Sequence, residues 1–293
     1  MTLTWIKLNL RFLLKNSWTI TSIAYSILGL IAIWCSLEGL FPEECPTGKK
    51  VLISALILLI TYLASFIISI IYTRSLNSIC VMEKGNGSKV YVRYGNFTKE
   101  FEQNEKRRNF IIPVNRCFDT IVDDILISRN SIHGQFLEYL YSKNYFSANS
   151  LSSAIEKTLS KLEKTDLNQD EKPYGNRYRY PVGTIVDICC TQNNHYYLLG
   201  LSLFNESLTA QTSKEDFVIA IQRMIEYCNK HSQGYPVILP LIGSGLSRTN
   251  INKNEVLRYL VRAFEINKDI INCDFHIVVW EQDKEEIAIT NLK

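Results

Sequence analysis

Two long apolar segments without a charged residue stand near the beginning of this 293-residue chain. They cover about residues 18–37 and 51–72, and neither contains Asp, Glu, Lys, Arg or His. Because a helix rises about 1.5 Å per residue, each segment is long enough to cross a hydrocarbon core of about 30 Å. The sequence therefore predicts a hairpin of two transmembrane helices, within a membrane region that covers residues 1–82.

Basic residues on the outer sides of this hairpin set its expected orientation. They are Lys7, Arg11 and Lys15 before the first segment, and Arg74 and Lys84 after the second. The connecting residues 38–50 contain three glutamates and two lysines, so their balance is less positive. Since short loops rich in Lys and Arg stay in the cytoplasm, we expect both termini and the large domain to be cytoplasmic.

Residues 83–293 have the pattern of one soluble α/β domain. Alternating or continuous apolar runs predict strands at residues 89–94, 110–114, 183–189, 196–204, 236–239 and 275–280. Amphipathic runs predict helices at residues 134–141, 151–162, 213–233 and 252–267, and residues 163–177 are expected to form an exposed loop. This alternation predicts a mixed sheet covered by helices, the α/β/α class. The net charge of +3 argues against a protein that coats nucleic acid.

The cysteine and histidine positions give no metal-binding pattern. Eight cysteines and four histidines are scattered along the chain, with no CxxC and no HExxH spacing. We therefore expect no metal site. Most cysteines lie in apolar runs of a domain expected to be reduced, which argues against a disulfide framework. Cys45, between the apolar segments, is left with two alternatives: pairing with Cys45 of a neighbouring copy, or remaining a thiol.

The strongest chemical signal lies where the predicted strand at residues 236–239 opens into a glycine-containing loop. The loop residues are Leu241, Ile242, Gly243, Ser244, Gly245 and Leu246. The two glycines permit close backbone approach, so that consecutive N–H groups can form an anion-binding nest. Arg248 and the following helix N-terminus add positive charge. Phosphate binding and a plain turn are the two interpretations of this loop.

A second candidate follows the predicted strand at residues 110–114. It consists of the polar loop Asn115, Arg116, Cys117, Phe118, Asp119 and Thr120, together with the segment Ser131-Ile132-His133-Gly134. A hydrolase interpretation makes His133 a base for Ser131 or Cys117, but no nucleophile-elbow motif supports it. The favoured interpretation places these residues as ligand contacts or structural positions at the carboxyl edge of the sheet.

Taken in this order, residues 89–282 resemble a macro domain, the ADP-ribose-binding α/β/α fold. Residues 94–98 look like the family's Gly-Asp-Ile-Thr segment, whose acidic residue holds the adenine amine, and Asn96 takes that place here. Residues 112–115 resemble the strand before the family's first loop, and residues 240–246 match its second phosphate loop. The glycine-rich first phosphate loop is absent, which argues against the ADP-ribose hydrolases of this fold.

A two-helix hairpin ahead of a divergent macro domain is similar to the membrane effectors of bacterial type II Thoeris defence. In that family a TIR-domain partner converts NAD into histidine–ADP-ribose during phage infection. The macro domain binds this signal, and the membrane part then damages the inner membrane. The resemblance implies an anti-phage effector that binds an ADP-ribose derivative, oligomerises and arrests the infected cell. It implies no enzymatic activity, cofactor or nucleic-acid partner.

The resemblance and the loop patterns together give a set of expected ligand-binding residues, with no catalytic residue and no metal ligand. The set is Asn96, Asn115, Arg116, Cys117, Phe118, Asp119, Thr120, His133, Gly134, Leu241, Ile242, Gly243, Ser244, Gly245, Leu246 and Arg248. Two alternatives stay open. One is a membrane-tethered NAD or ADP-ribose hydrolase that uses His133, Asp119 and Asp123. The other is a passive anchor that localises a partner.

Overall fold

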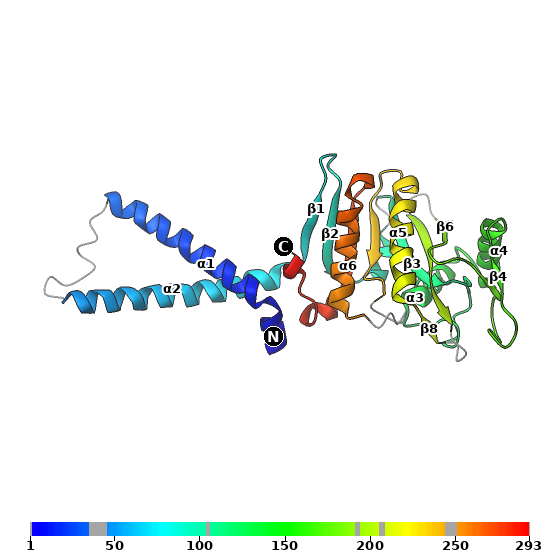
Figure 1. Ribbon diagram of the computed structural model, residues 1–293, viewed down its shortest axis with the longest axis horizontal. Helices are drawn as coiled ribbons and strands as arrows, with labels where there is room; N and C mark the ends of the chain where they lie inside the picture. The colour runs from blue at the N-terminus through cyan, green and yellow to red at the C-terminus, as the bar shows by residue number, and fades with distance from the viewer. Residues whose placement is uncertain are drawn as a thin grey trace. The chain divides into compact units, whose positions relative to one another are not determined.

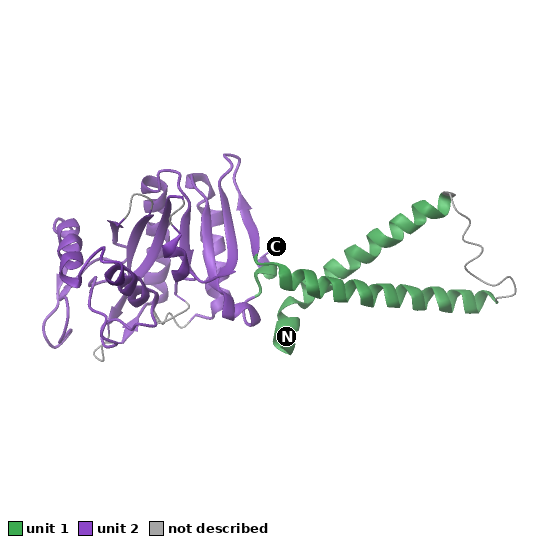
Figure 2. Ribbon diagram, turned by 180° about the vertical axis from the view of Figure 1, so that it is seen from behind, with its two compact units in different colours: residues 1–77, 288–291, 293 green, residues 78–287, 292 purple. Residues whose placement is uncertain are grey.

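The computed structural model describes residues 2–34, 46–103, 106–190, 194–204, 209–243 and 251–292. The chain forms two compact units (Figure 2). The helical unit comprises residues 1–77 with residues 288–291, and the sheet unit comprises residues 78–287. The sheet unit therefore begins ahead of the predicted boundary between residues 82 and 83. Cys45 and its possible pairing lie outside the described residues.

The helical unit contains α1, Leu3–Trp34, and α2, Thr47–Ser75 (Figure 1). Both helices are long and apolar enough to cross a membrane, by length and composition. They contain the predicted apolar segments as far as the described residues extend. The residues ahead of the first segment belong to the same helix, because α1 already begins at Leu3.

Polar side chains join α1 to α2. Thr21 Oγ1 donates to Ser65 Oγ at 3.0 Å, and Asn16 Nδ2 donates to Ser69 Oγ at 3.0 Å. Thr21, Ser65 and Ser69 are buried between the helices. Hydroxylated and small residues let two helices approach closely and form hydrogen bonds where lipid offers none. These contacts therefore specify which faces of α1 and α2 pack together.

The end of the chain returns to α1 within the helical unit. The short helix η5, Ile289–Leu292, brings Thr290 Oγ1 to 2.6 Å from Asn9 Oδ1, and both side chains are buried. Asn291 Nδ2 donates to the Leu8 carbonyl oxygen at 3.0 Å. The chain thus leaves the helical unit after α2, and its residues 288–291 belong to that unit again.

The sheet unit is built on a mixed sheet with strand order β1-β2-β10-β9-β3-β7-β6, and β8 pairs with β7. The pairings from β2 through β10, β9 and β3 to β7 are parallel, whereas β1 and β6 pair antiparallel at the edges. The strands are β1 Ser78–Glu83, β2 Lys89–Gly95, β3 Arg108–Asn115, β6 Ile185–Cys189, β7 Asn194–Phe204, β8 Ala210–Gln211, β9 Val237–Pro240 and β10 Phe275–Trp280. A separate two-stranded sheet pairs β4, Thr165–Asp166, with β5, Tyr178–Arg179.

Helices pack on both faces of this sheet. They are α3 Ile132–Ser142, α4 Ala148–Leu159, α5 Lys214–His231 and α6 Lys253–Ile266 (Figure 1). Alternate residues of β3, Phe110, Ile112 and Val114, pack in one core with residues of α3 and α4. On the opposite face the Phe275 ring of β10 packs on Phe264 of α6, with ring centroids 4.7 Å apart. Because the side chains of a strand alternate between the faces, each strand contributes to both layers.

Local sequence signals explain where these helices begin. Ser213 is the N-cap of α5, and its Oγ accepts a hydrogen bond from Asp216 N at 2.9 Å. Phe217, Ala220 and Met224 then recur at helical spacing and are buried. The predicted fold class, two apolar helices followed by a mixed α/β sheet domain, is confirmed. Four of the described strands, β1, β4, β5 and β8, were not predicted from the sequence, and β4 lies within residues 163–177, which were expected to form an exposed loop.

Candidate functional site

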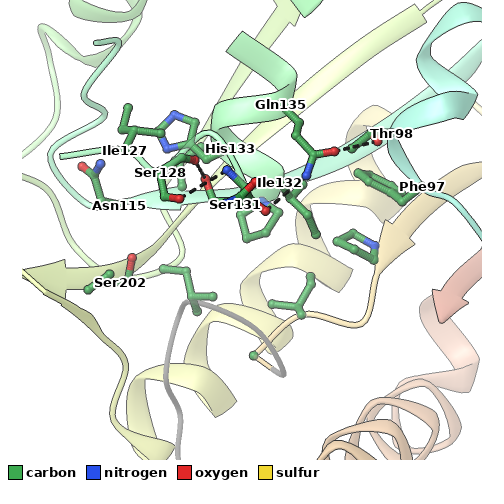
Figure 3. A pocket seen from close by; sticks show the side chains of 18 of the residues that line it. Phe97, Thr98, Asn115, Ile127, Ser128, Ser131, Ile132, His133, Gln135 and Ser202 are labelled. Carbon is green, nitrogen blue, oxygen red and sulfur yellow. Dashed lines mark hydrogen bonds between the residues drawn. The ribbon is translucent and has the colours of Figure 1, made fainter. Parts of the chain in front are cut away.

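A cavity of about 1040 Å³ opens at the carboxyl ends of the parallel strands (Figure 3). Its walls include residues at or shortly after the ends of β2, β3, β9 and β10, among them Asn96, Asn115, Gly243 and Trp280. Parallel strands present their carboxyl ends at one edge of a sheet, and open α/β sheets bind ligands outside that edge. We call this space the carboxyl-edge cavity.

The N-terminus of α3 forms one wall of the carboxyl-edge cavity. Ser131 is the N-cap, and its Oγ accepts from Gly134 N at 2.9 Å and donates to the Ser128 carbonyl oxygen at 2.6 Å (Figure 3). His133 follows in the first turn and is only 8% exposed. Burial lowers the pKa of His133 from 6.5 to about 3, so its ring is neutral at pH 7.

A side-chain hydrogen bond links the segment after β2 to α3 at another wall. Thr98 Oγ1 donates to Gln135 Oε1 at 2.9 Å (Figure 3). Asn96 Oδ1 accepts from the backbone N–H groups of Thr98 and Lys99, at 3.2 Å and 3.3 Å. The oxygen of Asn96 is therefore engaged in shaping the turn into the short helix η2, Thr98–Glu102.

The loop after β3 is held by a buried ion pair. Lys172 Nζ lies 2.6 Å from Asp119 Oδ2, and the two side chains are 1% and 2% exposed. Lys172 also donates to the Asn176 carbonyl oxygen at 2.6 Å. The backbone N–H of Asn176 donates to Asp119 Oδ1 at 2.7 Å, and its side-chain amide donates to the Cys117 carbonyl oxygen at 2.7 Å. The Asp119 carboxylate and the Cys117 carbonyl oxygen are therefore both bound by protein partners.

Phe118 turns into the core from the same loop. It takes a left-handed backbone conformation with φ 52° and is 2% exposed. Its ring packs edge-on against Tyr180, with centroids 5.8 Å apart. A Cβ added to Gly200 would lie 3.1 Å from the Phe118 ring, so the absence of a side chain there gives Phe118 its space.

Sequence comparison places the chain in a family. Residues 90–280 match the family model described as Thoeris protein ThsA, Macro domain, which is more than half of the chain. The chain belongs to this ThsA macro-domain family. The Thoeris protein ThsA of Bacillus amyloliquefaciens (strain Y2) is 26% identical over 215 residues, which cover 71% of this chain and 68% of that protein. The resemblance to a Thoeris effector with a macro domain is therefore confirmed at the level of the family.

Two solved structures are similar to this chain at low sequence identity. The Oceanobacillus iheyensis macrodomain with ADP is 10% identical, with a TM-score of 0.45 over 71% of this chain and 91% of that chain. Thermosipho africanus DarTG in complex with ADP-ribose is 10% identical, with a TM-score of 0.38 over 68% of this chain and 43% of that chain.

The structure brings together part of the predicted ligand-binding set in this ThsA-family chain. The residues that line the carboxyl-edge cavity are Asn96, Asn115, His133, Leu241, Ile242 and Gly243. Those that are described but do not line it are Arg116, Cys117, Phe118, Asp119, Thr120 and Gly134. The remaining positions, Ser244, Gly245, Leu246 and Arg248, lie outside the described residues. A ligand-binding role stays a prediction for the whole set.

Sequence reasoning missed one side of the cavity. Trp280, at the end of β10, is 50% exposed and lines it together with Lys253 and Asp283. Lys253 Nζ lies 2.6 Å from Asp283 Oδ1, which joins the start of α6 to the segment after β10. The position of Trp280 at the end of a predicted strand could have indicated this role. Trp280 is the last residue of a parallel strand, and open α/β sheets bind ligands at that edge.

The nucleophile arrangement considered for His133 is not assembled by the described residues. Ser131 uses its hydroxyl group to cap α3, with both hydrogen bonds made to backbone groups. Cys117 is 4% exposed, and burial raises the pKa of its thiol. A thiol that ionises less readily is a weaker nucleophile at neutral pH.

Gly134 permits the close contact between α3 and the turn before it. A Cβ added there would lie 2.2 Å from the Ser128 carbonyl oxygen and 2.9 Å from its carbonyl carbon, both backbone atoms. We expect Gly134→Ala to lower the free energy of unfolding by about 1–3 kcal/mol, because α3 must shift from the turn. Urea denaturation of the full chain in detergent measures this. Gly85→Ala, which meets no atom within 4 Å, is the control; equal midpoints for the two variants would refute the steric argument.

Proposed function

We propose that this ThsA-family protein is a ligand-gated membrane effector of anti-phage defence whose carboxyl-edge cavity binds an ADP-ribose-type signal. The observation that carries the proposal is this cavity of about 1040 Å³ at the carboxyl edge of a ThsA macro domain. Its size suits a dinucleotide-sized ligand, since small-molecule pockets span roughly 300–1,000 Å³. The solved macrodomain structure with ADP and the DarTG complex with ADP-ribose agree with this ligand class.

Two features at the cavity walls support distinct contacts with such a ligand. Gly243 has φ 90°, a conformation that favours glycine and exposes backbone to a phosphate group. Trp280 offers a half-exposed indole on which a base can stack. Asn96 has its side-chain oxygen engaged by backbone donors, so an adenine amine at this wall requires a different acceptor. The neutral His133 ring contributes hydrogen bonds and no positive charge.

The finer steps are part of the same proposal, and the family membership of the chain supports them. We infer that the signal is histidine–ADP-ribose, made by a TIR-domain partner, and that the helical unit resides in the bacterial inner membrane with the sheet unit in the cytoplasm. The ligand must bind one assembly of the protein more tightly than another, because a ligand shifts an equilibrium only through differential affinity. Assembly of the two apolar helices from several copies then disrupts the bilayer and arrests the infected cell.

Calorimetric titration of the full chain in detergent with histidine–ADP-ribose, ADP-ribose and NAD tests this proposal, with light scattering used to follow assembly. We expect Gly243→Ala to weaken binding at least about tenfold, or about 1.4 kcal/mol. Gly234→Ala is a matched control, since Gly234 has φ 78°, meets no atom within 4 Å and lies outside the cavity.

Each outcome separates the alternatives. Tight binding with a change in assembly, lost in Gly243→Ala and kept in Gly234→Ala, supports the effector. Turnover of NAD or ADP-ribose by the same preparation favours the membrane-tethered hydrolase. If the protein binds none of the three compounds, the proposal is overturned and the passive anchor becomes the favoured function.

A further inference from the structure

A second cavity, of about 1080 Å³, lies on the opposite face of the sheet from α6. Phe275 of β10 and its neighbour Val90 of β2 face α6, since the Phe275 ring contacts Phe264. The next residues along each strand, His276 and Tyr91, therefore point to the other face, where they line the second cavity. We call it the open-face cavity.

The walls of the open-face cavity carry an excess of positive charge. Its basic residues are Arg93, Lys99, Lys106, Arg107 and Arg108, and its acidic residues are Glu100 and Glu281. Glu100 Oε2 lies 2.6 Å from Arg93 and 3.7 Å from Arg108, so its charge is matched by arginines. The remaining cations attract an anion.

Buried polar atoms in these walls lack hydrogen-bond partners among the described residues. They are Oε1 of Glu100, Nε of Arg107 and Nδ1 of His276. Leaving such a group buried and unpaired costs about 1–3 kcal/mol. A ligand that enters after small side-chain rotations can supply an acceptor to the Arg107 N–H and a donor to the Glu100 oxygen. The required partner therefore carries both an anionic acceptor and a hydroxyl or amino donor.

Flat side chains line the same cavity. The rings of Tyr91 and His276 stack with centroids 4.9 Å apart and an interplanar angle of 10°. The Arg107 guanidinium lies 4.4 Å from the centroid of the Tyr235 ring. Planar aromatic and guanidinium surfaces interleaved with cations are the features that bind nucleotide bases and phosphates.

We propose that the open-face cavity is a second ligand site, which binds a phosphate-bearing small molecule with a planar ring, of the nucleotide class. The phosphate group binds among Lys106, Arg107 and Arg108, a ligand hydroxyl group donates to Glu100, and the planar ring lies against the pair formed by Tyr91 and His276. Of the described residues, Asn96 alone lines both cavities, so the two sites are chemically separate and adjoin at the turn into η2.

The test uses the full chain in detergent with ADP as the probe, and equilibrium dialysis measures the number of ADP molecules bound per chain. We expect two, one in each cavity. Arg107→Gln is expected to weaken the open-face site by about tenfold or more and to leave the other site unchanged. Lys106→Gln, an exposed residue, is expected to weaken the same site to a smaller extent. Arg262→Gln, which removes an exposed guanidinium elsewhere, is the matched control.

The outcomes keep this proposal separate from the proposed function. Retention of carboxyl-edge binding in Arg107→Gln shows that the variant is folded. If only the carboxyl-edge cavity does not bind ADP, one ADP molecule binds per chain. Its binding is then weakened by Arg107→Gln and unchanged by Gly243→Ala. Identical binding curves for Arg107→Gln, Lys106→Gln and Arg262→Gln overturn the second site. Displacement of ADP from it by short-chain phosphatidylglycerol at lower concentration than by AMP would assign the phosphate to a lipid headgroup and overturn the nucleotide class.

Discussion

Replacing Lys172 with methionine is expected to lower the free energy of unfolding of the sheet unit by about 3–5 kcal/mol. Lys172 and Asp119 are 1% and 2% exposed, and their charged atoms lie 2.6 Å apart. Methionine fills a similar volume but leaves the Asp119 carboxylate buried without a counter-charge. Removing one partner of a buried ion pair is strongly destabilising, because the remaining charge cannot reach water. The urea midpoint of the full chain in detergent, followed by near-ultraviolet circular dichroism, measures the loss.

A second substitution identifies the cause of that loss. Lys172→Met combined with Asp119→Asn removes both charges and keeps an acceptor for the Asn176 N–H group, so most of the stability should return. Lys161→Met, at an exposed lysine near the same segment, should change stability by no more than about 0.5 kcal/mol. A single variant no less stable than the double variant would show that the ion pair does not hold the fold.

The same ion pair shapes the carboxyl-edge cavity. Asn176 donates to the Cys117 carbonyl oxygen and Lys172 donates to Asp119, so these contacts hold the loop after β3. Pro173, next to Lys172 in the chain, lines the cavity directly. Loss of Lys172 therefore releases a wall of the cavity as well as a buried charge. Ligand affinity is expected to fall together with stability in Lys172→Met and to recover with it in the double variant.

Strands with a continuous apolar run or a regular alternation of apolar and polar residues were predictable, because both patterns are local. The predicted strands at residues 89–94, 110–114 and 275–280 correspond to β2, Lys89–Gly95, to β3, Arg108–Asn115, and to β10, Phe275–Trp280. β1 was missed because it follows closely on an apolar span. Its six residues show only a short alternation of buried and exposed positions.

The candidate site was predictable only where a residue follows its own strand. Asn96, Asn115 and Gly243 line the carboxyl-edge cavity because each lies at or just after the carboxyl end of a parallel strand. Asp119 was expected in a ligand-binding loop, but its partner Lys172 comes 53 residues later, in a polar segment with the composition of an exposed loop. No local pattern reveals such a pairing, since it depends on where the tertiary fold returns the chain.

The stability of the sheet unit is expected to decrease as the pH falls below 6.5, through His133. Burial lowers the pKa of His133 to about 3 in the folded state, whereas an unfolded histidine keeps a pKa of about 6.5. The unfolded chain therefore binds the proton first, and the folded state loses about 1.4 kcal/mol per pH unit between these values. Between pH 7 and pH 5 this contribution is about 2 kcal/mol. Above pH 7 it is fully present.

His133→Gln isolates this contribution. The variant keeps a polar side chain without a titrating ring, so its urea midpoint should fall less between pH 7 and pH 5, with about 2 kcal/mol separating the two pH dependences. Nitrogen-15 shifts of the His133 ring, assigned by their loss in the variant, should still report a neutral imidazole at pH 5. A protonated ring at that pH, or parallel stability curves for the two proteins, would contradict the depressed pKa. Because the ring lines the carboxyl-edge cavity, its neutrality also means that a diphosphate there must be held by backbone N–H groups and other cations.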